Sequence, residues 1–169
     1  MAGRASKLLS VLVLSATLGL VACGSDDAEN SEATAATTST ESATFEPKDV
    51  DTKVVENINS PERDEGLNIN VELLYTASNQ QGSGSVIYVL VTNRNEMPLP
   101  NDAIGQPTLR VSGSDVSPVT SGTQELDLPL KPGATVNLAY AFDTSYNSLY
   151  DATFTIGNLE FSGNLNNVS

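Results

Sequence analysis

The chain has 169 residues, a formal net charge of −13 and a hydrophobic content of 39%, which together allow one ordinary domain with appendages. It contains no histidine, and its single cysteine, Cys23, excludes an internal disulfide; a histidine-based catalytic triad or metal site is excluded as well. The acidic excess disfavours nucleic acid as a partner, because phosphate groups repel it.

Residues 1–22 have the pattern of a secretory signal peptide. Arg4 and Lys7 precede an apolar run over residues 8–22, as the charged and hydrophobic regions of such a signal do. As a helix this run would span about 22 Å, which is short of the roughly 30 Å hydrocarbon core of a bilayer. We therefore prefer a cleaved signal to a membrane-spanning anchor.

The apolar run ends in Leu20-Val21-Ala22-Cys23, which resembles the lipobox of bacterial lipoproteins. The resemblance implies cleavage between Ala22 and Cys23 by the lipoprotein signal peptidase and attachment of diacylglycerol to the Cys23 thiol. Acyl chains such as palmitate contribute about 0.8 kcal/mol per buried CH₂, so two chains hold a protein firmly. We predict a lipoprotein at the extracytoplasmic face of the cell membrane, with lipid rather than protein surface attaching it.

Residues 23–53 are predicted to form a disordered tether. The segment is rich in Ser, Thr, Ala and acidic residues, with Phe45 as its one aromatic residue, so it cannot bury enough surface to offset its ordering entropy. Two interpretations stay open, a plain spacer and a stalk that carries O-linked sugar. Val54, Val55 and Ile58 form a weak apolar cluster that begins the domain, as a short helix or an edge strand.

The domain itself, residues 54–169, is predicted to be an all-β sandwich of about seven strands. From Leu67 to Tyr75 apolar residues alternate with polar ones, as in a half-buried strand. Residues 86–92 are apolar on both faces, which is typical of a central strand. Turn signals recur every 8–12 residues, and Gly157-Asn158 suits a type II′ hairpin turn. The predicted strands are residues 67–75, 86–92, 108–112, 116–120, 136–142, 152–156 and 159–161.

Several segments of this domain resemble the immunoglobulin-like extracellular domains of Gram-positive lipoproteins. The segments are YVLVTN, LDLPLKPG leading into VNLAYAFD, and the closing FTIGNLEF hairpin. These domains are mostly of unknown function and are similar in fold to secreted immunoprotective antigens. The resemblance covers about residues 66–165 and implies an immunoglobulin-like antiparallel sandwich, but it brings no catalytic residues.

The remaining polar motifs give no clear chemistry. Asp127, Asp143 and Asp151 lie at strand ends or in loops, where aspartate usually caps turns; weak Ca²⁺ binding is the alternative. The Gly82-Ser83-Gly84 segment lacks the lysine and the helix of a phosphate-binding loop, so it is predicted to be a turn. We predict no catalytic residue, no metal ligand and no cofactor.

Two loops carry amphipathic residues that suit a contact surface. Tyr146 and Tyr150 fall in one loop, and Met97 and Leu99, with Ile104, fall in another. The leading hypothesis is a non-enzymatic, membrane-anchored domain that contacts another envelope protein or an envelope polymer. The alternative is a structural spacer or antigen-like surface protein without a dedicated ligand.

Overall fold

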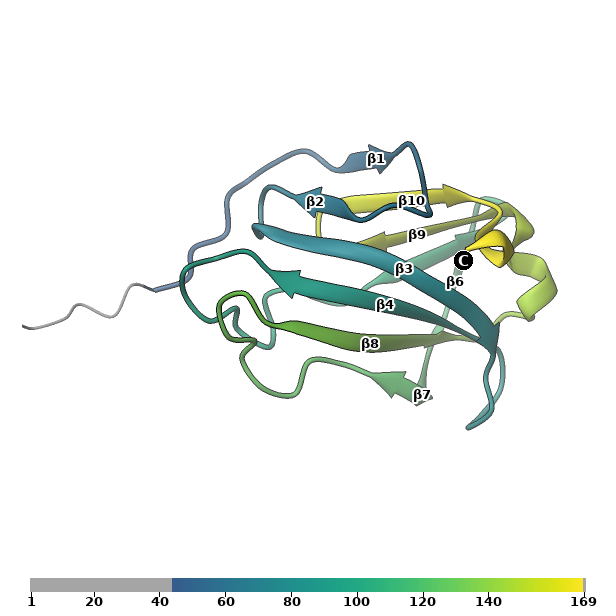
Figure 1. Cartoon of the computed structure of the whole chain (residues 1–169). Coiled ribbons are helices and arrows are strands. Elements are labelled where there is room, and N and C mark those ends of the chain that lie inside the picture. The colour runs from purple at the N-terminus through teal and green to yellow at the C-terminus, as the bar shows by residue number, and fades with distance from the viewer. Residues whose placement is uncertain (1–43, 169) are drawn as a thin grey trace, which may run out of the picture. The chain divides into compact units, whose positions relative to one another are not determined.

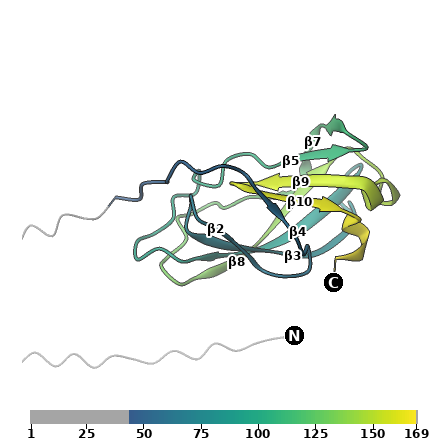
Figure 2. The ribbon, with the colours of Figure 1, turned by 90° about the horizontal axis from the view of Figure 1, so that it is seen from above.

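The computed structural model describes residues 44–168, which form two β-sheets packed face to face (Figures 1 and 2). Sheet A has the order β1-β10-β9-β5-β6, and sheet B has the order β2-β3-β4-β8-β7. Sheet A consists of β1 (Lys53–Val55), β5 (Thr108–Val111), β6 (Ser114–Val116), β9 (Ala152–Ile156) and β10 (Leu159–Gly163). Sheet B consists of β2 (Glu62–Asp64), β3 (Ile69–Ser78), β4 (Ser85–Asn93), β7 (Pro118–Gln124) and β8 (Thr135–Phe142). The predicted all-β sandwich is confirmed.

Helical structure in the described residues is limited to two short 3₁₀ turns, η1 (Tyr146–Asp151) and η2 (Leu165–Asn167). No helix within residues 44–168 is long and apolar enough to cross a membrane.

The core lies between the two sheets and is built from the inward side chains of alternating strands. Phe154 of sheet A meets Tyr140 and Phe142 of sheet B, with ring centroids 6.2 and 6.1 Å apart. Leu138 is buried on the inner face of β8, while its neighbour Asn137 is exposed. Strand β4 lies at the centre of sheet B, as the run of apolar residues predicted.

The described residues contain ten strands rather than the predicted seven. Two of the additional strands, β1 and β2, have three residues each, which is too short for an alternating pattern to be recognised. The third arises because the segment predicted as one strand over residues 116–120 is divided at Ser117 between β6 and β7. The chain changes sheets at this point, so both strands lie at sheet edges.

The ordered domain begins earlier than predicted. Phe45, assigned to the disordered tether, packs against the core, and the Lys48 amide donates to the carbonyl of Gly66 at 2.8 Å. Val55 is buried, and β1 pairs with β10 in parallel, so of the two predicted alternatives, a short helix or an edge strand, the edge strand is the one present. Burial of the aromatic ring of Phe45 contributes favourable free energy, whereas the polar residues around it have little apolar surface to bury. The predicted signal peptide, Cys23 and residues 24–43 of the predicted tether lie outside the described residues.

A buried carboxylate joins the two sheets. Asp64, at the end of β2, is 1% exposed and accepts hydrogen bonds from the Gly66 and Leu67 amides, both at 2.9 Å. It also accepts from the Asn158 amide at 2.8 Å and from the Asn158 side chain at 2.9 Å. Gly157 has φ +55°, and a Cβ there would overlap the Asp64 carboxylate. The turn between β9 and β10 therefore needs glycine for two reasons.

Candidate contact surfaces

The structure places the four predicted contact residues at opposite ends of the sandwich. Tyr146 and Tyr150 lie on η1, which follows the end of β8, and Tyr150 is 61% exposed. Tyr146 is half-buried against the core and lines a polar hollow of about 490 Å³. Met97 and Leu99 follow β4, whose last residues pair with the first residues of β8. The two loops therefore do not form one surface.

Leu99 is not a contact residue. It is 0% exposed, and its backbone exchanges two hydrogen bonds of 2.9 Å with Leu130. The amide of the buried Asn93 holds this loop in place by donating to the carbonyls of Met97 and Leu130. Ile104 of the same loop is buried as well. These aliphatic side chains close one end of the core, so the prediction for Leu99 is wrong.

The three aspartates considered for turn capping or calcium remain separate. Asp143 accepts a hydrogen bond from the Ser83 hydroxyl at 3.3 Å, and the Asp151 carbonyl accepts from the Ser112 amide. Asp127 lines a hollow beside β7. Within residues 44–168 no three histidine, cysteine, aspartate or glutamate side chains are close enough to hold a metal ion.

A stacked pair of tyrosines, missed by the sequence analysis, lies on the outer face of sheet B. Tyr75 and Tyr88 are cross-strand partners whose ring centroids are 4.3 Å apart at an interplanar angle of 19°. Tyr75 is 48% exposed, although the alternation from Leu67 predicted an inward position. A bulge between Leu73 and Tyr75 adds one residue to β3 and so reverses the face of every later residue.

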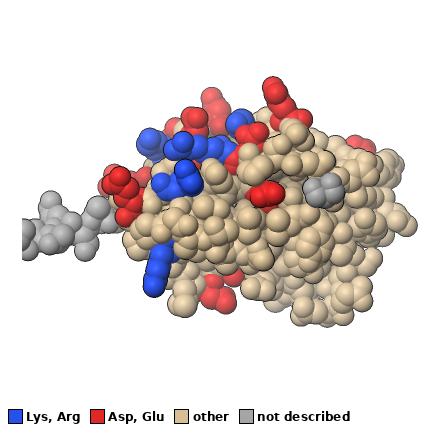
Figure 3. All heavy atoms as spheres, in the orientation of Figure 1, with Lys and Arg blue, Asp and Glu red and all other residues tan. Residues whose placement is uncertain are grey.

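The rest of this face is largely uncharged. Leu90, half-buried, pairs with Glu72 on one side and Asn137 on the other. In Figure 3, most of the surface over β3, β4 and β8 is free of charged side chains, and the lysines and arginines gather toward the upper left.

One end of the outer face is covered by the protein itself. Val86, Ala139 and Ala141 form a second small apolar cluster there, with Tyr88 and Val119 packed against it. Nearby, the Asn79 side chain ties the turn after β3 to β7, because its amide donates to the carbonyls of Ser83 and Ser121 at 2.9 and 2.8 Å. Tyr88 therefore borders the covered end of the face, and its stacking partner Tyr75 is the exposed member of the pair.

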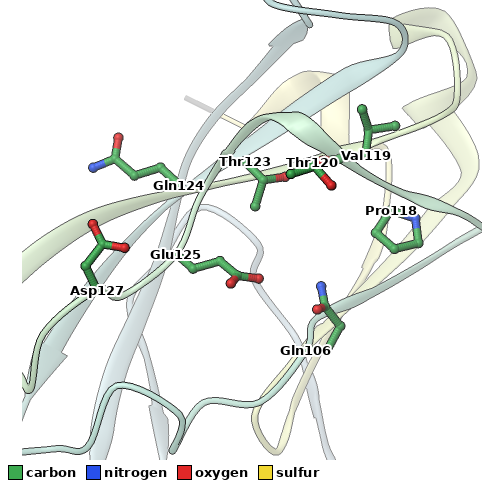
Figure 4. Close-up of a pocket in the computed structure, with 8 residues that line it drawn as sticks. All are labelled: Gln106, Pro118, Val119, Thr120, Thr123, Gln124, Glu125 and Asp127. Carbon is green, nitrogen blue, oxygen red and sulfur yellow. The ribbon is translucent and has the colours of Figure 1, made fainter.

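A polar groove runs beside β7 and is called the β7 groove below. It consists of two adjoining hollows, of about 510 and 280 Å³, that share Gln106 and Glu125. Figure 4 shows these two side chains facing each other across the larger hollow. Tyr140 lines the smaller hollow, where burial and the nearby Glu125 carboxylate raise the pKa of its phenol. The remaining lining residues are Asn101, Asp102, Ile104, Gly105, Pro118, Val119, Thr120, Thr123, Gln124, Leu126 and Asp127.

Comparison with protein-family models, with curated proteins and with solved structures found no match to this chain in any of the three. The predicted kinship with immunoglobulin-like lipoprotein domains therefore stays a prediction from the sequence segments.

Proposed function

We propose that this chain is a bacterial lipoprotein, anchored at the extracytoplasmic face of the cell membrane by diacylglycerol on Cys23. Its immunoglobulin-like sandwich contacts another cell-envelope protein or an envelope polymer and catalyses no reaction. The proposal combines the signal and lipobox pattern of residues 1–23 with one structural observation, the stacked tyrosines on an open sheet face.

The tyrosine pair has the physical properties of an interface anchor. Tyrosine combines a large apolar ring with a hydroxyl, and it is enriched among the residues that contribute most to binding. Tyr75 and Tyr88 already stack on each other, so less side-chain entropy is lost when a partner arrives. A partner would cover the 48% of Tyr75 that solvent now reaches.

The small number of charges on this face supports the same conclusion. The described domain is acidic overall, and burying charged groups in an interface is costly unless they are paired. Further along the outer face from the tyrosines lie Leu90, Asn137 and Thr92, with Glu72 as the acidic group opposite Leu90. Such a face can be desolvated at lower cost than the acidic remainder of the surface.

The alternative is a spacer or antigen-like protein without a dedicated ligand, since single exposed apolar side chains are common on protein surfaces. Cross-linking in intact membranes followed by affinity capture separates the two. We expect a stoichiometric partner to be captured with the unaltered protein. Tyr75→Ala should reduce that capture about tenfold, because a well-packed aromatic anchor contributes more than 1.4 kcal/mol.

Tyr150→Ala provides the matched control, because Tyr150 is also an exposed tyrosine but lies on η1 at the end of the sandwich. It should leave the capture unchanged. Capture of random neighbours alone, in amounts that none of these substitutions alters, would favour the spacer.

A further inference from the structure

The β7 groove is held open by the protein's own hydrogen bonds. Val119 pairs with Ala141 and Gln124 pairs with Ala139, so the intervening residues of β7 bulge out of the sheet. The Thr123 hydroxyl accepts from the Ala141 amide at 3.0 Å and donates to the Val119 carbonyl at 2.6 Å. These bonds replace the missing rungs of the ladder, so the shape of the groove does not depend on a ligand.

Tyr140 carries a polar group that has no partner in the described part of the chain. Its side chain is 3% exposed and its ring packs against Phe154, yet its hydroxyl makes no hydrogen bond to any residue among 44–168. Tyr140 lines the smaller hollow, so a molecule bound there would accept a hydrogen bond from its hydroxyl.

The other lining groups define what that molecule can be. Asp102, Glu125 and Asp127 repel phosphate, sulfate and carboxylate groups. They do not assemble into a metal site in the described domain. Together with the amides of Gln106 and Gln124, they offer many acceptors for hydroxyl protons.

Apolar contact is available beside these polar groups. Pro118 lines the larger hollow and presents C–H surface, whereas the Val119 side chain points away from Gln106 and Glu125 in Figure 4. A pyranose ring has the matching character, with hydroxyls around its edge and C–H groups on its faces. The combined size of the two hollows falls within the range of about 300–1,000 Å³ that is typical of small-ligand sites.

We propose that the β7 groove binds a neutral sugar residue of an envelope glycan, with the Tyr140 hydroxyl as a hydrogen-bond donor to it. This inference rests on the proposed function, since it names the chemical class of the polymer. It uses a different surface from the tyrosine pair of sheet B, so the two can be tested separately.

The test is isothermal titration of the purified full-length protein with defined probes. These are maltotriose, mannotriose, triacetylchitotriose, and the neutral polysaccharide fraction released from the cell envelope; trigalacturonate and Ca²⁺ serve as charged probes. At least one neutral probe should bind with a Kd in the roughly micromolar to millimolar range. Trigalacturonate should bind at least about tenfold more weakly, because carboxylates line the groove.

Two substitutions locate the binding. Tyr140→Phe removes only the hydroxyl, and Gln106→Ala changes an exposed side chain, so each should weaken binding about tenfold through one lost hydrogen bond. Tyr140→Phe should also leave the unfolding midpoint unchanged or higher, because the ring keeps its packing. Tyr146→Phe is the control and should alter neither property.

Three results would overturn the groove proposal: no neutral probe binds, Ca²⁺ alone binds in a way that Glu125→Gln abolishes, or Tyr140→Phe clearly lowers the midpoint. A membrane partner whose capture needs Tyr75, together with no binding of any neutral probe, would refute the groove and support the contact function. Sugar binding without any captured partner would support the groove and refute the contact function of the tyrosine pair.

Discussion

Asp64 shows how one side chain can connect two sheets. Its carboxylate accepts hydrogen bonds from the connection that follows β2 and from the turn between β9 and β10. If a side-chain amide replaced this carboxylate, one of these N–H donors would face its NH₂ group or lose its acceptor. Hydrogen bonds to a charged group contribute about 1.5–3 kcal/mol each, and they are not additive.

Asp64→Asn should therefore lower the free energy of unfolding by about 2–4 kcal/mol, measured by urea denaturation of the purified protein. The side-chain amide of the asparagine has one acceptor oxygen where the carboxylate has two. Asp115→Asn is the control: Asp115 is exposed, and its ion pair with Arg110 at 3.3 Å lies at the surface, so the loss should stay within about 0.5 kcal/mol. Equal, small losses of unfolding free energy from both variants would show that Asp64 does not hold the two sheets together.

At the scale of elements, the two bulges determine the candidate contact surfaces more than the regular strands do. The bulge in β3 turns Tyr75 outward, and the bulge in β7 opens the groove. Each bulge adds residues to one strand that have no partner on the neighbouring strand. The side chains that follow the bulge therefore point differently from what regular alternation predicts. Strand β8, in contrast, keeps an unbroken register with β4 from Thr135 to Phe142.

The regular register of β8 gives a paired prediction. Leu138→Ala removes a buried side chain from the inner face and should cost about 2–5 kcal/mol of unfolding free energy. Asn137→Ala, on the outer face, should change it by no more than about 0.5 kcal/mol. Urea denaturation monitored by circular dichroism measures both. Comparable losses from the two variants would mean that the register is wrong.

At the scale of the whole molecule, the proposed attachment depends on one atom. Cys23→Ser removes the only thiol in the chain, so the protein should be released or remain as an unprocessed precursor. Membrane fractionation followed by immunoblotting measures location and size. Ser31→Ala, a change in the proposed tether, should leave the mature protein in the membrane fraction. A Cys23→Ser protein found in the membrane at mature size would refute lipid anchoring.

Much of this protein follows from local sequence. Strands and their faces could be predicted from the alternation in residues 67–73 and 136–142, because burial of one face depends on residues two apart. The run of β4, apolar on both faces, predicted a central strand, and Gly157 predicted the hairpin turn. Within the predicted strand 136–142, Leu138 is buried and Asn137 is exposed, as such an alternation requires. Cys23 and the segment before it predict the anchor without any folded structure.

Only the tertiary structure decided which exposed side chains come together. Leu99 in its loop is buried because the end of the core needs to be closed, and no local pattern distinguishes it from a surface residue. A bulge has no reliable local signal, so the outward Tyr75 and the β7 groove could not be predicted. Asp64 and Asn158, or Gln106 and Glu125, meet only after the two sheets pack. Local periodicity fixes the face of a residue on its own strand, whereas partners distant in the chain are chosen by packing.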